Sequence, residues 1–188
     1  MSPMSTPGAL LFLLLLALLL AGVLSIVFHT LKTGISPMPT SGRVRRALLT
    51  LVPAEQEGVV LELGAGWGTL AFALADHCPR AQVVAFELSP LPYAFCRLRQ
   101  GLAPRPNLRL VRQDFLEASF AEASLVVCYL FPGAMARLGP KLVAELPPGG
   151  RIVSSTFALR GWRPLRTVVV DDLYRTPLYL YEVPPSAP

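Results

Sequence analysis

The chain has 188 residues, 53% of them hydrophobic, and a formal net charge of +5. Residues 1–54 carry four basic and no acidic side chains, so the rest of the chain, with 13 basic and 12 acidic residues, is nearly neutral. A nucleic-acid-binding protein would be expected to show a concentrated basic face, and we therefore expect no nucleic-acid partner.

The first element along the chain is an apolar segment, residues 9–28, that contains no charge. As a helix at about 1.5 Å per residue it would reach roughly 30 Å, the thickness of a bilayer core. No Lys or Arg precedes it, and it is longer than the roughly 7–15 apolar residues of a cleaved signal peptide, the alternative interpretation. Basic residues follow it, so the positive-inside rule predicts a single-pass membrane protein with the rest of the chain on the cytoplasmic side.

Short segments flank this predicted transmembrane anchor. Residues 1–8 form an N-terminal tail, and residues 29–40 form a linker in which Gly34, Pro37 and Pro39 break any helix. A single domain is expected over residues 41–184, followed by a proline-rich tail at 185–188. Its first helix would start after Ser41, a capping residue, with apolar residues at helical spacing at Val44, Leu48 and Leu51.

Apolar strands then alternate with helical stretches. The predicted strands are 59–63, 81–87, 108–112, 125–130 and 151–157, and the predicted helices are 70–75, 91–100 and 134–146. This alternation predicts an α/β fold with a Rossmann-like, doubly wound, mostly parallel sheet. Two β-rich runs, 167–170 and 178–183, predict an antiparallel terminal hairpin at the sheet edge.

The first predicted strand ends in a loop with glycine at every second position, Gly64, Gly66 and Gly68. The second strand ends at Glu87, so both strands deliver ligand-binding groups to one crevice at the carboxyl ends of the sheet. A dinucleotide fingerprint would need a glycine or alanine where Thr69 stands, and no Gly-Lys-Ser/Thr follows as in a Walker loop. The crevice therefore favours another nucleotide-like ligand.

The sequence E-L-G-A-G-W-G, followed by a strand that ends in F-E-L, resembles the first two motifs of class I S-adenosylmethionine-dependent methyltransferases. The resemblance implies S-adenosyl-L-methionine as cofactor. The glycine loop would lie beside its methionine part, and the acidic residue of the second strand would bind both ribose hydroxyls. An acidic and an aromatic residue after the third strand would lie at the adenine. Carboxylates suit a diol and a cationic sulfonium, whereas they would repel a pyrophosphate. The implied cofactor-binding residues are Glu62, Gly64, Ala65, Gly66, Gly68, Glu87, Leu88, Asp114 and Phe115.

Segments outside these motifs resemble a membrane-associated branch of protein-lysine methyltransferases, which includes the mitochondrial enzyme acting on the c subunit of ATP synthase. They are SPMPTSGRVRRAL, the stretch from YLFPG to SSTF, and VDDLYRTPLYLYEV. The resemblance implies that Pro39, Thr40, Phe131 and Pro132 lie near the substrate. Trp67 departs from the branch, where that loop position is usually acidic or small and polar, so the substrate identity stays open.

Methyl transfer is an in-line displacement in which proximity and alignment supply most of the rate, so few catalytic groups are needed. A lysine amine, with a pKa near 10.4, must first lose a proton, which an apolar pocket favours. Tyr129 is the candidate catalytic residue for orienting the amine, although a tyrosine in an apolar strand can equally belong to the core. No Asp-Pro-Pro-Tyr or Asn-Pro-Pro-Tyr follows the fourth strand, which disfavours nucleic-acid amines.

The cysteines, Cys78, Cys96 and Cys128, are odd in number and form no C-x-x-C pair, so we expect a reducing compartment and no metal. The leading hypothesis is a membrane-anchored methyltransferase acting on a lysine of a membrane or membrane-adjacent protein. One alternative is methylation of a lipid headgroup or membrane-borne small molecule, and another is an inactive cofactor-fold module that binds a membrane partner. The target residue, the number of methyl groups and the oligomeric state are left open by the sequence.

Overall fold

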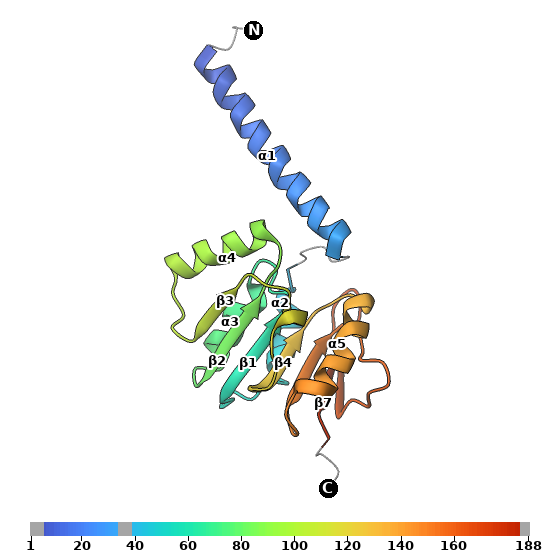
Figure 1. Cartoon of the computed structure of the whole chain (residues 1–188). Coiled ribbons are helices and arrows are strands. Elements are labelled where there is room, and N and C mark those ends of the chain that lie inside the picture. Colours follow the sequence, from blue (N-terminus) through green and yellow to red (C-terminus); the bar gives the residue numbers. More distant parts are fainter. Residues whose placement is uncertain (1–5, 34–38, 185–188) are drawn as a thin grey trace. The chain divides into compact units, whose positions relative to one another are not determined.

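The computed structural model of the chain describes residues 6–33 and 39–184, and the chain divides into two compact units, Met1–Ser36 and Pro37–Pro188 (Figure 1). The described residues of the first unit form the helix α1 (Thr6–Thr33). Its segment Pro7–Phe28 is long and apolar enough to cross a membrane, judged by length and composition, and is not buried within the structure. The helix continues through residues 29–33, predicted as linker, because nothing in His-Thr-Leu-Lys-Thr breaks it; Gly34 and Pro37 lie outside the described residues.

The second unit is built on a sheet of seven strands in the order β3-β2-β1-β4-β5-β7-β6. Pairs among β1 to β5 are parallel, whereas β7 pairs antiparallel with both β5 and β6. The predicted doubly wound sheet with an antiparallel end hairpin is therefore confirmed. The strands are β1 (Gly58–Leu63), β2 (Ala81–Phe86), β3 (Leu108–Val111), β4 (Ala123–Cys128), β5 (Arg151–Ser155), β6 (Arg166–Val169) and β7 (Pro177–Glu182).

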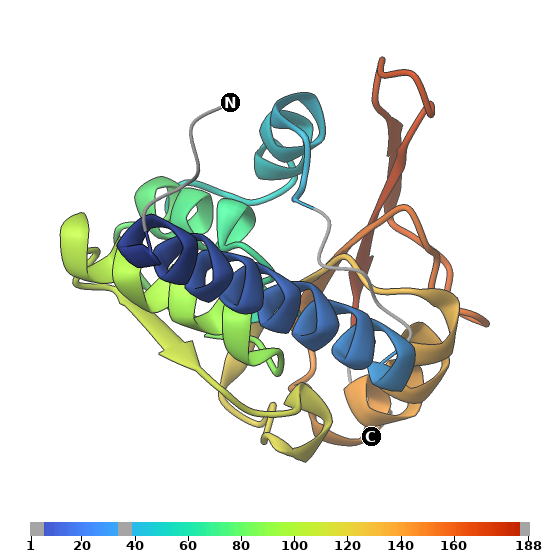
Figure 2. The same ribbon diagram turned by 90° about the horizontal axis from the view of Figure 1, so that it is seen from above.

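Helices cover both faces of this sheet, with α3 and α5 on opposite sides in the view from above (Figure 2). One core cluster joins the buried residues of α2 and α3 to one face of the central strands, through side chains such as Val60, Leu125 and Val127. The buried residues of α5 lie outside this cluster and cover the other face. The helices are α2 (Gly42–Leu49), α3 (Thr69–His77), α4 (Pro90–Leu102) and α5 (Pro132–Glu145), with the short 3-10 helix η1 (Phe115–Glu117).

Local sequence explains where several elements start and stop. The Ser41 hydroxyl oxygen accepts a hydrogen bond from the Val44 amide, 3.3 Å away, and so caps α2 as predicted. Two strands end two residues earlier than predicted. β4 ends at Cys128, because Leu130 is buried as a loop residue and not as part of the ladder. β5 ends at Ser155, because Thr156 has a φ of 69°, a left-handed conformation that no strand accommodates.

One polar side chain holds three separate backbone segments together. The amide nitrogen of Asn107 lies 3.0 Å from the carbonyl oxygen of Ala75, 3.1 Å from that of Cys78 and 3.2 Å from that of Ala81. These carbonyls belong to the last turn of α3, the turn after it and the start of β2. Asn107 thus fixes the return of the chain from α3 to the second strand.

We predict that Asn107→Ala lowers the free energy of unfolding by about 1–3 kcal/mol, because buried carbonyl groups lose their donor. Asn107→Asp should cost more, since a carboxylate cannot donate to carbonyl oxygens and repels them. Urea unfolding of the full chain in detergent measures both effects. Gln82→Ala, an exposed change on β2, is the control, and equal stability of all variants would contradict the role of Asn107.

Candidate functional site

The glycine loop, residues 64–68, connects the carboxyl end of β1 to α3. Its glycines all have positive φ, 83° at Gly64, 53° at Gly66 and 74° at Gly68, which explains the alternating spacing in the sequence. The amides of Gly64 and Ala65 donate to the carbonyl oxygen of Phe86, at 3.0 and 2.8 Å. The loop is therefore tied to the end of β2, as expected for neighbouring parallel strands.

The two outer glycines of the loop and the central one have different surroundings. A Cβ at Gly68 would lie 2.8 Å from the Cys96 sulfur and 3.1 Å from the Phe72 ring, and one at Gly64 would lie 3.2 Å from Leu130. A Cβ at Gly66 would meet no atom within 4 Å. The Cβ directions of Gly64 and Gly68 thus face protein atoms, whereas that of Gly66 faces open space, from which a ligand can approach the backbone.

Glu87 joins the two motifs that the sequence separates. One of its carboxylate oxygens accepts a hydrogen bond from the Gly66 amide and the other from the Ser89 amide, both at 2.7 Å. The residue is 9% exposed and directly follows β2, whose Phe86 is level with Leu63 of β1. The carboxylate from the second strand therefore lies beside the glycine loop, as the order of the strands predicts.

Glu62 is the most unusual side chain of the site. It is 3% exposed, and its Oε2 atom has no hydrogen-bond partner among the described residues. Burial, reinforced by the negative charge of Glu87, raises its pKa to about 8. A buried carboxyl oxygen without a partner among the described residues is costly, so this position suits a cation or hydrogen-bond donor supplied by a ligand.

Asp114 and Phe115 follow β3, the next strand along the sheet. The ends of β2 and β3 are adjacent, because the Glu87 amide donates to the Val111 carbonyl oxygen at 3.0 Å. Asp114 caps η1 by accepting a hydrogen bond from the Leu116 amide at 3.0 Å, and Phe115 is buried. The structure thus places both residues at the carboxyl edge of the sheet, on the Glu87 side, with Leu88 half-buried between β2 and α4.

The predicted catalytic and substrate-proximal residues on the other side of the loop follow β4. Tyr129 lies beyond the end of the strand and is half-buried, unlike its neighbours Cys128 and Leu130, which are fully buried. Phe131 and Pro132 begin α5, and a Cβ at Gly133 would lie 2.5 Å from the Phe131 ring. Tyr129 is therefore not a fully buried core residue, and its role in orienting the amine stays a prediction.

Pro39 and Thr40 are separated from these residues along the chain and come immediately before α2. Pro39 is exposed and Thr40 is half-buried. α2 is fixed in the core by Val44 and Leu48, and its Arg43 donates to the backbone carbonyl of Asp171 in the turn between β6 and β7, at 3.2 Å. The proximity of Pro39 and Thr40 to a substrate stays a prediction.

Two residues that support the site were not predicted from the sequence. The Cys96 thiol on α4 donates to the Gly66 carbonyl oxygen at 3.3 Å, and the Ser89 backbone amide holds Glu87. Cys96 is fully buried, and burial raises the pKa of its thiol to about 12, so it is a neutral donor. The sequence indicates only that Cys96 lies on the inner side of an amphipathic helix, and this does not identify its hydrogen-bond partner.

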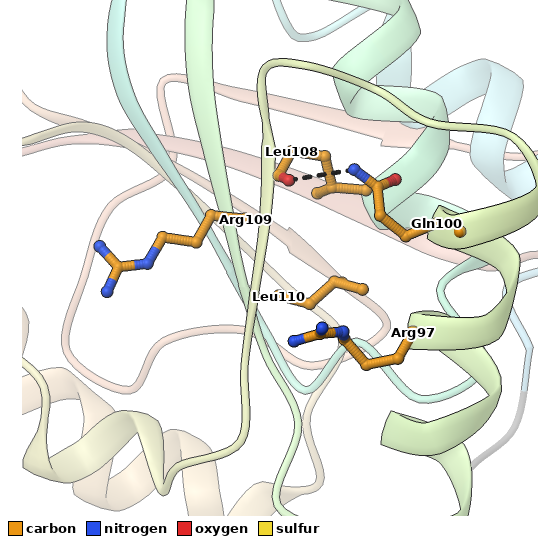
Figure 3. A pocket seen from close by; sticks show the side chains of 6 residues that line it. Arg97, Gln100, Leu108, Arg109 and Leu110 are labelled. Carbon is orange, nitrogen blue, oxygen red and sulfur yellow. Dashed lines mark hydrogen bonds between the residues drawn. The ribbon is translucent and has the colours of Figure 1, made fainter.

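A separate hollow of about 480 Å³ lies between α4 and β3 (Figure 3). It is lined by Arg97, Gln100, Gly101, Leu108, Arg109 and Leu110, none of which is a predicted site residue. The guanidinium group of Arg97 faces it and makes it unsuitable for a cationic ligand, whereas the Arg109 side chain points away from it, to the other side of β3 (Figure 3). No group of three or more potential metal ligands occurs among residues 6–33 and 39–184.

Comparison with known proteins identifies the family. A family model described as the ANTKMT methyltransferase domain matches residues 62–166, more than half of the chain. The chain belongs to this family. The match begins at Glu62, so it includes the whole glycine loop, Glu87, Asp114 and the segment after β4.

Curated relatives agree with this assignment. A protein-lysine N-methyltransferase of Saccharolobus islandicus is 30% identical over 141 residues, 72% of this chain and 84% of the relative. The mouse adenine nucleotide translocase lysine N-methyltransferase is 32% identical over 132 residues, 70% of this chain and 56% of that enzyme. The mouse lysine N-methyltransferase of the ATP synthase c subunit is 27% identical over 163 residues, 79% of this chain and 65% of that enzyme.

Among solved structures, an RNA methyltransferase from Salinibacter ruber in complex with S-adenosyl-L-homocysteine has a TM-score of 0.69 at 30% identity. The match covers 80% of this chain and 97% of that one. The expected resemblance to class I S-adenosylmethionine-dependent methyltransferases is confirmed, as are methyl transfer as the activity and S-adenosyl-L-methionine as the cofactor.

We predict that Glu62→Gln changes how stability depends on pH. The folded wild type keeps the Glu62 proton up to a pKa of about 8, whereas the unfolded chain loses it near the ordinary pKa of 4.5. Within this window the unfolded state binds fewer protons, so the wild-type free energy of unfolding falls as pH rises and levels off above about pH 8. The variant should lose less stability between these limits.

Denaturant titrations of wild type, Glu62→Gln and the exposed control Glu122→Gln at several pH values, without cofactor, measure this difference. Comparing pH dependences removes the constant cost of the buried amide. If wild type and Glu62→Gln show the same pH dependence, Glu62 does not hold its proton in the folded state.

We predict that alanine at the two loop glycines has separable effects. Both variants force a non-glycine residue into a left-handed conformation, at a cost of roughly 1–2 kcal/mol. Gly68→Ala adds a collision with Cys96 and Phe72, so it should be the less stable variant without cofactor. Gly66→Ala should lose proportionally more cofactor affinity, because its Cβ occupies the open side. Thermal unfolding and isothermal titration test this order, and the reverse order would contradict it.

Proposed function

We propose that this chain is a membrane-anchored methyltransferase that transfers a methyl group from S-adenosyl-L-methionine to a lysine side chain of a membrane or membrane-adjacent protein. The family match over residues 62–166 carries the proposal. Its lysine specificity is supported by three relatives that are named as lysine or protein-lysine N-methyltransferases. Its anchoring is supported by the apolar segment Pro7–Phe28.

The described residues fit the cofactor. Among them, Glu62 has a buried oxygen without a partner, Glu87 is held against the loop, and the loop is open at Gly66. When bound, S-adenosyl-L-methionine supplies an electrophilic methyl group on a positively charged sulfur. We assign the balancing of positive charge to Glu62 and the ribose hydroxyls to Glu87, whose oxygens can accept further hydrogen bonds. Asp114 and Phe115 would hold the adenine, and Ala65 and Leu88 would border the cofactor.

The remaining residues of the site would act on the acceptor. We assign orientation of the lysine amine to Tyr129, which lies at the end of β4, the strand next to β1. Phe131 and Pro132, with Pro39 and Thr40, would form walls around the lysine side chain. Apolar walls exclude water and disfavour the charged ammonium form, which lowers the amine pKa toward the range in which it can attack.

The proposed membrane placement is based on α1 and the basic residues that follow its apolar segment. If Pro7–Phe28 spans a bilayer, the basic residues on its C-terminal side place the catalytic unit on the cytoplasmic side. The Lys32 and Arg43 to Arg46 region would then lie near anionic headgroups. A lipid headgroup or membrane-borne small molecule is the alternative acceptor, because the same tether would hold the site close to lipids.

Incubating membranes with the full chain and S-adenosyl-L-methionine labelled in its methyl group distinguishes these acceptors. We expect label in polypeptide, on lysine after hydrolysis. Label only in solvent-extractable lipid would refute the lysine assignment, and label in neither fraction, with no cofactor binding, would favour an inactive module.

We predict that two conservative variants separate cofactor binding from acceptor orientation. Glu87→Gln should weaken cofactor binding by roughly tenfold or more, because hydrogen bonds to a charged group contribute about 1.5–3 kcal/mol. Tyr129→Phe should lower kcat and leave the cofactor Kd unchanged. Titration calorimetry and single-turnover labelling measure both. Tyr174→Phe, an exposed tyrosine in the turn between β6 and β7, is the matched control. Cofactor binding unaffected by Glu87→Gln would contradict the assignment of the ribose contact.

A further inference from the structure

The outer side of α4 carries a row of exposed apolar residues that the fold does not use. Leu91, Phe95, Leu98 and Leu102 are 38%, 46%, 62% and 79% exposed. At 3.6 residues per turn their side chains fall within an arc of about 60°, so they form one straight row, here called the α4 stripe. The buried residues of this helix, Pro92 and Cys96, lie on another side.

No other helix of the unit Pro37–Pro188 presents such a row within its described residues. α5 has one large exposed apolar residue, Val143, and the remaining ones of this unit lie on β6 or in the loops around it. An amphipathic helix normally buries its apolar side against the core, so a second apolar side left in solvent indicates an interaction surface.

The charged residues of the segment that contains α4 and β3 are all basic. Residues 90–112 contain five arginines and no acidic residue. Arg97 and Arg99 lie on the two flanks of the stripe, and Arg97 borders the hollow beside α4, whereas the Arg109 side chain points to the other side of β3 (Figure 3). Arg99 is placed over the Phe72 ring at 4.1 Å, and Arg105 pairs with Asp76 at 2.9 Å. Arg97, which belongs to α4 itself, is exposed beside the stripe.

We propose that α4 lies on an anionic phospholipid surface, with the α4 stripe at the boundary of headgroups and acyl chains and the flanking arginines on lipid phosphates. An apolar row bordered by basic residues is the pattern of helices that lie in the plane of a membrane interface. Three of the four stripe residues are leucines, which offer no stacking surface for nucleotide bases, so a lipid surface fits this combination better than RNA does.

The proposal rests on α1 being the membrane anchor of the proposed function. Residues 34–41 connect α1 to α2, and eight residues cover at most about 3.6 Å each, or roughly 29 Å. The catalytic unit is therefore confined to the vicinity of a bilayer that α1 crosses. Tethering removes most of the entropic cost of association, so a modest stripe suffices for a second contact.

The contact would also orient the site. Phe95 of the stripe packs edge to face against Trp67 of the glycine loop, with ring centroids 5.5 Å apart. A bilayer in contact with Phe95 is thus one side chain away from the cofactor loop. Trp67, the loop residue that differs from the protein-lysine methyltransferases resembled by this sequence, would link the loop to the lipid-facing helix. The acceptor lysine would then lie close to the level of the lipid headgroups.

The test places an environment-sensitive fluorophore at Leu98→Cys in the full chain, reconstituted in nanodiscs that contain phosphatidylserine. Native cysteines do not interfere, because Cys78, Cys96 and Cys128 are all buried. Val143→Cys, on the exposed side of α5, is the matched control, and Leu16→Cys reports on α1 separately. Lipids with a doxyl quencher near the carbonyl end of the acyl chain detect interfacial depth, roughly 5–10 Å below the surface.

We expect the fluorophore at position 98 to lose most of its emission to the shallow quencher in phosphatidylserine discs, and less in purely zwitterionic discs, while position 143 is unaffected. Unquenched emission at position 98 in both discs overturns the proposal, whatever position 16 shows. A blue shift without lipid quenching also overturns it, since the stripe then contacts protein. A separate measurement tests the anchor, using lipids with the quencher near the terminal methyl group of the acyl chain. If the probe at position 16 is not quenched by these lipids, α1 does not cross the bilayer.

Discussion

The hydrogen bond from the Gly66 amide to the Glu87 carboxylate, 2.7 Å long, connects the two halves of the site. It joins the end of β1 to the end of β2 and fixes the open turn of the glycine loop. Cys96 holds the same glycine by donating to its carbonyl oxygen. Gly66 is therefore held by both its backbone groups, while the space beyond its Cα stays free. A rigid loop with one open side is what a ligand that contacts backbone requires.

The electrostatics of the site depend on this arrangement. Holding Glu87 close to the loop leaves a negative charge near Glu62, which is already buried, and together these raise the Glu62 pKa to about 8. The Oε2 atom of Glu62 is unsatisfied by the described residues, and a positively charged or hydrogen-bond-donating ligand would stabilise it. The same negative character disfavours pyrophosphate, consistent with a methyltransferase family and not with a dinucleotide enzyme.

Helix α4 connects the site to the surface of the catalytic unit. α4 contributes Cys96 to the loop on its inner side and Phe95 to Trp67 on its outer side. One helix therefore connects the cofactor loop to an exposed apolar and basic surface. If that surface rests on lipid, a single layer of side chains separates the membrane from the cofactor loop. The depth of a lysine relative to the bilayer surface would then help to decide whether the enzyme can methylate it.

The fold was largely predictable, because the periods of apolar residues and the positions of glycine and proline are local properties. The strands were predicted to within one residue at every end except both ends of β4 and the end of β5, and the terminal hairpin was predicted from its β-rich runs. The exceptions have non-local causes. Leu130 looked like strand because it is apolar, yet it is buried as a loop residue, and only the ladder shows that β4 ends at Cys128. Likewise, β5 ends before Thr156 because this residue has a positive φ, which cannot be predicted from a threonine in the sequence.

By itself the sequence determined the order of elements, the glycine loop and its partner Glu87, because spacing along adjacent parallel strands dictates which residues share the carboxyl edge. Tertiary structure alone decided that Cys96 and Ser89 hold this arrangement, that one Glu62 oxygen lacks a partner among the described residues, and that the α4 stripe is exposed. Those properties depend on which side of a helix meets which neighbour and on whether water reaches a group. Both are consequences of three-dimensional packing, which periodicity in one chain cannot specify.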